Sequence, residues 1–341
     1  MKTLKEIYQA NEELNYIDSS LYSRYRVKAG LRNDNGTGVK VGLTKICDVI
    51  GYKFVHEKKY NIDGQLIYRG YPINYLVDKQ PKDRIFGFEE VAFLLIFGTL
   101  PTEEQLQEFK DYLLNFKMGP VDLQYETPNI LNALQIEVLK LYAKDPSADT
   151  DDLEERMIKG LNILASIPLF TFSYAHNKVF KSYPYPDKSL AENILCMARG
   201  NDQYTLEEAR ILDTLLMIHA DHGGGNNSTF ANVVISSTGT DIYSCISAAI
   251  GSLKGPKHGG ANCKVTNMFK AIFHEVGFTT DKLTLKKIAN RLLDKDFFDH
   301  SGLIYGIGHA IYTKSDPRAL LIQQQCETVS YTHLRAHETV L

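Results

Sequence analysis

Residues 205–226 have the sequence TLEEARILDTLLMIHADHGGGN, in which a helix-forming segment runs into a glycine-rich polar turn. Thr205 and Glu208 have the spacing of a capping box, which marks the start of a helix. The residues that follow are apolar on nearly every side, so we expect this helix to be buried. We therefore expect the polar residues 219–226, which follow this helix, to lie at an interior surface.

Helix-start signals followed by an apolar period near 3.6 recur along most of the chain. We expect further helices at 102–116 and from 189 onward, each beginning at a capping box (Thr102, Ser189), at 127–141 with Thr127 as the cap, at 241–253 and at 284–293. Strand signals are confined to residues 42–65, where Gly51 and the Asp63-Gly64 pair are the expected turn points of a short hairpin. The predicted fold is all-α with a short N-terminal β-hairpin.

Length and composition indicate an ordinary globular protein. The 341 residues exceed the usual size of one domain and favour two. The net charge of -3 supplies no field that would attract nucleic acid or an anionic membrane. Five cysteines without a CxxC pair favour a reducing compartment over a disulfide framework. With no signal peptide and no apolar run of roughly 20 residues, the expected location is the cytoplasm.

Three histidines lie in separate glycine-containing motifs. These are His222 in HADHGGGN, His258 in GPKHGGAN and His309 in GIGHAIYTKSDPR. Glycine lets backbone N–H groups approach a ligand, while histidine can donate a hydrogen bond or exchange a proton near neutral pH. Arg318, at the end of the third motif, adds a planar guanidinium whose N–H groups match the two oxygens of a carboxylate.

The order and separation of these motifs resemble those of the citrate synthases. LIYRGYPI at 66–73 and FGTLPT at 97–102 are similar to two further motifs of that family, and the resemblance runs from about residue 25 to residue 328. It implies a two-domain helical fold, with a large domain at 1–259 and a small domain at 260–328. It also implies a homodimer in which the small domain closes over the substrates.

The resemblance further implies an acyltransferase that condenses acetyl-CoA with oxaloacetate and hydrolyses citryl-CoA, without a permanently bound cofactor. His258 is implied to hydrogen-bond the thioester oxygen of acetyl-CoA and to stabilise the enolate. His309 is implied to polarise the keto group of oxaloacetate and protonate the new alkoxide, while His222 and Arg318 hold the carboxylates. The family's contact with the CoA adenine matches the backbone of Gly306, Ile307 and Gly308. Many relatives carry an aromatic residue at the middle position of these three.

In that family a catalytic aspartate and two further arginines, one of them from the partner subunit, follow the SDPR sequence. Here no aspartate follows Arg318, and Arg335 is the only later arginine. Residues 329–341, VSYTHLRAHETVL, resemble a translated vector sequence, so we expect a non-native tail there and assign no role to His333, Arg335 or His337. Because general-base catalysis contributes about 10²–10⁴-fold, a chain without this base is predicted to release almost no CoA.

Two other functions stay open from the sequence. One is a 2-methylcitrate synthase using propionyl-CoA, since one methylene in an apolar pocket is worth only about 1–3 kcal/mol. The other is a catalytically dead truncated fragment. A metal hydrolase is disfavoured because His219 and His222 are three residues apart and not four as in HExxH. A phosphate-binding P-loop is disfavoured because His258, not Ser or Thr, follows Lys257. We therefore predict no metal site.

Overall fold

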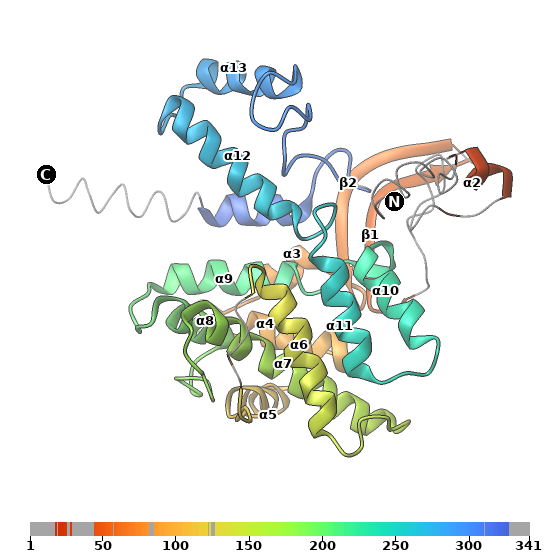
Figure 1. Cartoon of the computed structure of the whole chain (residues 1–341), viewed down its shortest axis with the longest axis vertical. Coiled ribbons are helices and arrows are strands. Elements are labelled where there is room, and N and C mark those ends of the chain that lie inside the picture. The colour runs from red at the N-terminus through yellow and green to blue at the C-terminus, as the bar shows by residue number, and fades with distance from the viewer. Residues whose placement is uncertain are drawn as a thin grey trace, which may run out of the picture.

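The computed structural model of the chain describes residues 18, 20–25, 28, 44–56, 58–81, 85–121, 123, 127–309 and 311–326. Helices α4 to α11 form the main body, a long β-hairpin rises beside it, and α12 and α13 stand apart from it (Figure 1). The dominance of helices over one three-stranded sheet confirms the predicted all-α class with an N-terminal hairpin. Nowhere in the described ranges is a helix long and apolar enough to cross a membrane.

The sheet is antiparallel and consists of β1 (Cys47–Val55), β2 (Lys58–Tyr68) and β3 (Tyr71–Pro72). The predicted turn at Asp63-Gly64 is wrong, because both residues lie inside β2 and the first two strands are joined after Val55. Gly51 is not a turn either: it lies at a β-bulge, where the register shifts between Ile50 and Tyr52.

Close approach of another segment explains the two strand glycines. A Cβ atom on Gly51 would collide with the backbone of Ile311, and one on Gly64 would collide with the backbone of Ser315. Gly51 and Gly64 therefore form a notch in the hairpin, and the chain around residues 311–315 lies in it. Since glycine is also common in turns, the sequence pattern alone suggested the wrong local structure.

The helices follow in chain order. They are α2 (Ser20–Tyr25), α3 (Ile73–Asp78), α4 (Gly87–Phe97), α5 (Glu103–Leu114), α6 (Ile130–Lys144), α7 (Leu153–His176), α8 (Leu190–Arg199), α9 (Leu206–Ile218), the 3-10 turn η2 (Gly223–Gly225), α10 (Asn227–Ser236), α11 (Ile242–Leu253), α12 (Ala261–Val276) and α13 (Lys282–Leu293). Residues 317–326 are also helical. The capping boxes predicted at Thr102, Ser189 and Thr205 are confirmed.

Two predicted helix starts need correction. Asn129, not Thr127, caps α6, because its side chain accepts the N–H of Leu131. Thr127 supports this cap from outside the helix, where its hydroxyl accepts the N–H of Asn129. The last predicted helix, α13, begins two residues before Thr284, and Asp281 is its cap.

Helix α9 is buried along most of its length, as predicted. Met217 and Ile218 belong to the main apolar core, and within α9 only the first residue, Leu206, is exposed, at 44%. The buried face also carries Asp213, whose carboxylate accepts the N–H groups of Gly87 and Phe88 at the start of α4. This bond fixes α9 against α4, and with it the turn that follows α9.

A separate small apolar cluster lies between α12 and α13. Its buried members are Met268, Ile288 and Leu292. The predicted boundary between a large and a small domain, at residue 259, falls just before α12 and stays a prediction.

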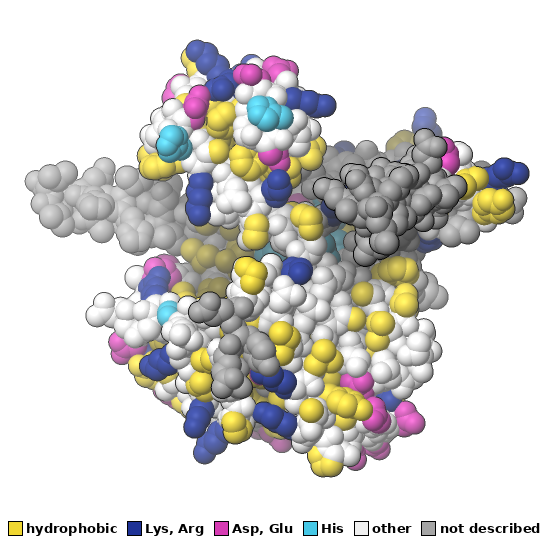
Figure 2. Space-filling view, in the orientation of Figure 1, with side chains coloured by type: hydrophobic (Ala, Val, Ile, Leu, Met, Phe, Trp, Pro, Cys, Tyr) yellow, Lys and Arg dark blue, Asp and Glu magenta, His cyan; other side chains and the backbone are white. Residues whose placement is uncertain are grey.

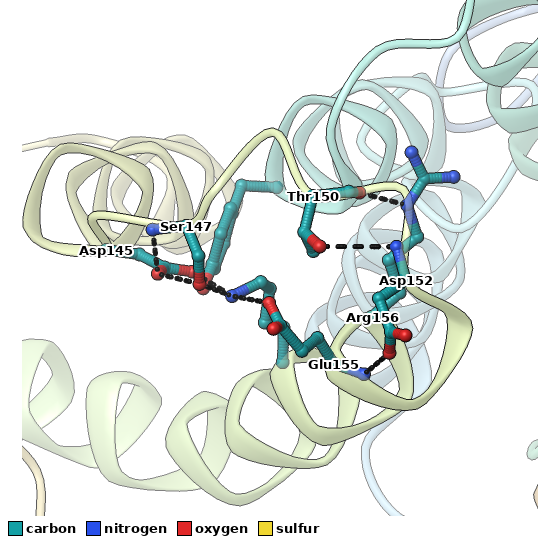
Figure 3. Close-up of polar contacts among 8 residues, drawn as sticks. Asp145, Ser147, Thr150, Asp152, Glu155 and Arg156 are labelled. Carbon is teal, nitrogen blue, oxygen red and sulfur yellow. Dashed lines mark hydrogen bonds and ion pairs between the residues drawn. The ribbon is translucent and has the colours of Figure 1, made fainter.

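A largely buried ion pair and its hydrogen bonds connect α11 to α6 and α7. Lys159 Nζ lies 2.7 Å from Asp145 Oδ2, and Tyr243 of α11 donates its hydroxyl to the same oxygen at 2.8 Å. The Ser147 N–H donates to the other oxygen of Asp145 (Figure 3). Burial opposes ionisation of Asp145, but the hydrogen bonds from Lys159 and Tyr243 outweigh it and lower the pKa of Asp145 to about 2. Because α11 leads directly to His258, this network helps to place a candidate site residue.

We predict that Lys159→Met lowers the free energy of unfolding at pH 7 by about 2 kcal/mol, because the partly buried Asp145 loses its charged partner. Urea denaturation followed by circular dichroism measures the change. The difference from the parent should shrink as the pH falls from 3.8 toward 2, since the pair stabilises only while Asp145 is ionised.

Asp151→Asn is the control, because it removes an ion pair with Arg156 in which Asp151 is 96% exposed. It should cost less than about 1 kcal/mol. Equal losses in the two variants would contradict a stabilising role for the buried pair.

Candidate functional site

A cavity of about 730 Å³ brings together His222, His258, His309 and Arg318. They come from three parts of the chain: the turn after α9, the turn between α11 and α12, and the segment that leads into the helix at 317–326. One wall of the cavity is apolar and comes from α11, where it consists of Ile246, Ala249, Ile250 and Leu253. The four side chains selected from the sequence motifs therefore share one site.

The turn that carries His222 is held by β1 and β2. Tyr68 is fully buried, and its Oη lies 3.1 Å from the backbone oxygens of Met217 and Asp221. Gly223 has a φ of 68°, and a Cβ atom there would lie 3.1 Å from the backbone oxygen of Cys47, so the turn packs tightly on β1. His222 thus projects from a rigid support.

His219 has a structural role at the end of α9. Its Nδ1 lies 2.7 Å from the backbone oxygen of Leu215, to which it can only donate a hydrogen bond.

The imidazole of His309 is held in one tautomer. Its Nδ1 lies 3.1 Å from the N–H nitrogen of Ile311 and 3.0 Å from that of Tyr312. Because backbone N–H groups only donate, Nδ1 must accept, and the ring proton is on Nε2. The Nε2–H then donates to Nε2 of His222 at 2.9 Å.

This pairing leaves His222 with its proton on Nδ1, a buried atom without a hydrogen-bond partner among the described residues. Burial, with the charge of Arg318 and the neighbouring His309, lowers the pKa of His222 to about 4. Burial and Arg318 also lower the pKa of His309. Both imidazoles are therefore neutral at pH 7, and His309 is a hydrogen-bond donor at Nε2.

Arg318 supplies the positive charge. Its Nε and Nη2 donate to the two carboxylate oxygens of Asp316 at 3.0 and 2.7 Å. This arrangement fixes the plane of the guanidinium and uses two of its five N–H donors. Among the described residues no group accepts a hydrogen bond from the other donors, so these can bind an anionic ligand in the cavity.

His258 is paired with a serine that the sequence analysis missed. His258 Nε2 lies 3.0 Å from Ser228 Oγ, which also lies 3.0 Å from the backbone oxygen of Ala249. Burial lowers the pKa of His258, so this ring is also neutral at pH 7. Ser228 stands in the first turn of α10, just after the glycine turn, but nothing in that position indicates a partner 30 residues later.

The predicted CoA-binding residues directly precede His309 in the chain. Gly306 and Gly308 have φ values of 87° and 103°, and Ile307 between them is 77% exposed. These three residues are not among those that line the cavity in the described part of the chain. Their contact with CoA stays a prediction.

Comparison with known proteins identifies the family. The family model described as citrate synthase, C-terminal domain, matches residues 33–339. The chain belongs to the citrate synthase family. A citrate synthase of Haloferax volcanii is 35% identical over 280 residues, which cover 78% of this chain and 68% of that protein. A 2-methylcitrate synthase of Corynebacterium glutamicum is 31% identical, over 79% and 68% of the respective chains.

The fold agrees with the solved structures of citrate synthases. That of Thermotoga maritima superimposes with a TM-score of 0.65 and 27% identity, and the match covers 89% of this chain and 73% of that one. The family is one of acyltransferases, so the chain is assigned to an enzyme family.

Across the described ranges, no three His, Cys, Asp or Glu side chains gather as a metal site. Residues 329–341 lie outside the described ones, and the non-native tail stays a prediction.

We predict that Arg318→Met raises the pKa of both His222 and His309, because loss of a nearby positive charge favours the imidazolium form. NMR titration of the imidazole signals measures both values. Arg199→Met is the control, since Arg199 pairs with Glu208 on the surface. An unchanged pKa of His222 in Arg318→Met would show that Arg318 does not act on the site.

Proposed function

We propose that the chain carries the substrate site of a citrate synthase, the enzyme that condenses acetyl-CoA with oxaloacetate and hydrolyses citryl-CoA to citrate and CoA. The observation that carries this proposal is the neutral His309, fixed with its proton on Nε2, beside the guanidinium of Arg318 in one cavity. A fixed neutral donor next to a cation suits a dianionic keto acid, because it polarises the keto group while the cation binds a carboxylate.

Oxaloacetate would enter between the two imidazoles. Its keto oxygen would replace His222 Nε2 as the acceptor of the His309 Nε2–H, and the free N–H groups of Arg318 would bind a carboxylate. His222, with its proton moved to Nε2, would donate to the same ligand. When the new carbon–carbon bond forms, the alkoxide would take the proton from His309 Nε2.

The acetyl group would bind beside His258. Ser228 Oγ has one proton and donates it to the Ala249 oxygen, so it accepts the Nε2–H of His258, and the thioester oxygen would take its place as the acceptor of that Nε2–H. That bond stabilises the enolate formed when the methyl group loses its proton. The backbone of residues 306–308 would contact the CoA adenine. The family removes this proton with an aspartate, and residues 319–341 contain none.

A 2-methylcitrate synthase is the second candidate. Its support is the 31% identity to a protein of that name, close to the 35% identity to a citrate synthase. The apolar wall that α11 contributes to the cavity offers a surface against which an extra methylene would pack. Comparing turnover of acetyl-CoA and propionyl-CoA, in a chain that carries the catalytic aspartate, separates the two. A homodimer in the cytoplasm is proposed with either function, on the family resemblance.

We expect the purified 341-residue chain to bind oxaloacetate at least about tenfold more tightly than 2-oxobutyrate, which keeps the keto acid but lacks the second carboxylate. Isothermal titration calorimetry at pH 7 measures both affinities. Arg318→Met should abolish this advantage, whereas Arg199→Met should keep it. Equal binding of the two keto acids by the parent chain would overturn the proposal.

A further inference from the structure

One aromatic ring lies against both substrate-binding groups of the site. Tyr312 is 6% exposed, and its ring stacks on the imidazole of His309 with a centroid distance of 4.5 Å and an interplanar angle of 22°. The Arg318 Cζ lies 5.8 Å from the centroid of the same ring. Tyr312 is not among the residues that line the cavity, so it supports these groups from behind.

The same residue is anchored to the hairpin. Its hydroxyl donates to the backbone oxygen of Gln65 in β2 at 2.9 Å. Three residues beyond Tyr312, Ser315 Oγ accepts the N–H of Gly64 at 3.1 Å. The site segment, defined as residues 309 and 311–318, is thus docked in the notch that Gly51 and Gly64 leave in the hairpin.

The docking of the site segment on the hairpin and the tautomer of His309 are linked through the backbone. The N–H of Tyr312 is one of the two donors that hold Nδ1 of His309, so a shift of Tyr312 loosens the imidazole as well as the stack. We propose that Tyr312 is a positioning residue, which holds His309 and Arg318 in their mutual orientation by fixing the site segment to β2. The proposal rests on the function proposed above, because it concerns how the same site binds a keto dicarboxylate.

Two substitutions separate the two contacts of the side chain. Tyr312→Phe keeps the stacked ring and removes only the bond to Gln65, so oxaloacetate affinity should fall by about fivefold, the effect of one hydrogen bond. Tyr312→Leu removes the stack too, and the affinity should fall by at least about thirtyfold, because small misplacements of site groups are costly. Calorimetry at pH 7 measures both.

The pKa of His309 is a readout that a merely structural role would not move. Besides Tyr312, the groups that face His309 are His222, Arg318 and Asp316, all unchanged in these variants. Removing the ring exposes the imidazole to water, so NMR titration should show a higher pKa of His309 in Tyr312→Leu and the parent value in Tyr312→Phe.

Tyr183→Phe is the matched control, because Tyr183 is also buried and donates to a backbone oxygen, that of Ala165, at 2.7 Å. This variant should have a lower free energy of unfolding than the parent but the same affinity for oxaloacetate. Gly64→Ala tests the notch in the hairpin and should weaken oxaloacetate binding, because its methyl group would collide with the backbone of Ser315. Gly119→Ala should not weaken binding, since the space around its Cβ position is open.

The outcomes distinguish the two proposals. If the parent chain does not bind oxaloacetate, the proposed function fails, and the His309 titration still tests Tyr312. If the parent binds while both Tyr312 variants keep its affinity and its His309 pKa, the positioning role is overturned.

Discussion

The contact between His222 and His309, 2.9 Å between their Nε2 atoms, is the interaction on which the site depends. The two rings are 87 residues apart in sequence, so both segments must be held rigidly. Tyr68 fixes the turn that carries His222, and the glycine notch of the hairpin receives the segment that carries His309. The small sheet in this helical protein therefore holds these two segments next to each other.

Burial gives the site its chemical character. It lowers the pKa of all three site histidines, so at neutral pH they are uncharged and serve as hydrogen-bond partners at fixed atoms. Arg318 then carries the positive charge, and Asp316 fixes its orientation. In a partly desolvated cavity such an arrangement binds anions strongly and keeps polarising donors neutral.

Much of this was predictable from the sequence, because local signals and residue types carry it. Capping boxes marked α5, α8 and α9, and the glycine-flanked histidines with Arg318 converge in one cavity. Contacts between distant segments were not predictable. Ser228 meets His258, and Gly64 makes room for Ser315, only through tertiary packing, which is why the serine was missed and the glycine was assigned to a turn.

The most direct test of the account is the ¹³C NMR signal of the keto carbon of bound oxaloacetate. If a fixed Nε2–H of His309 polarises the keto group, this signal should move downfield on binding to the parent chain. It should return toward its position in free solution in His309→Gln, under conditions where that variant is saturated with ligand. A bound keto carbon with an unshifted signal in the parent chain would contradict the account.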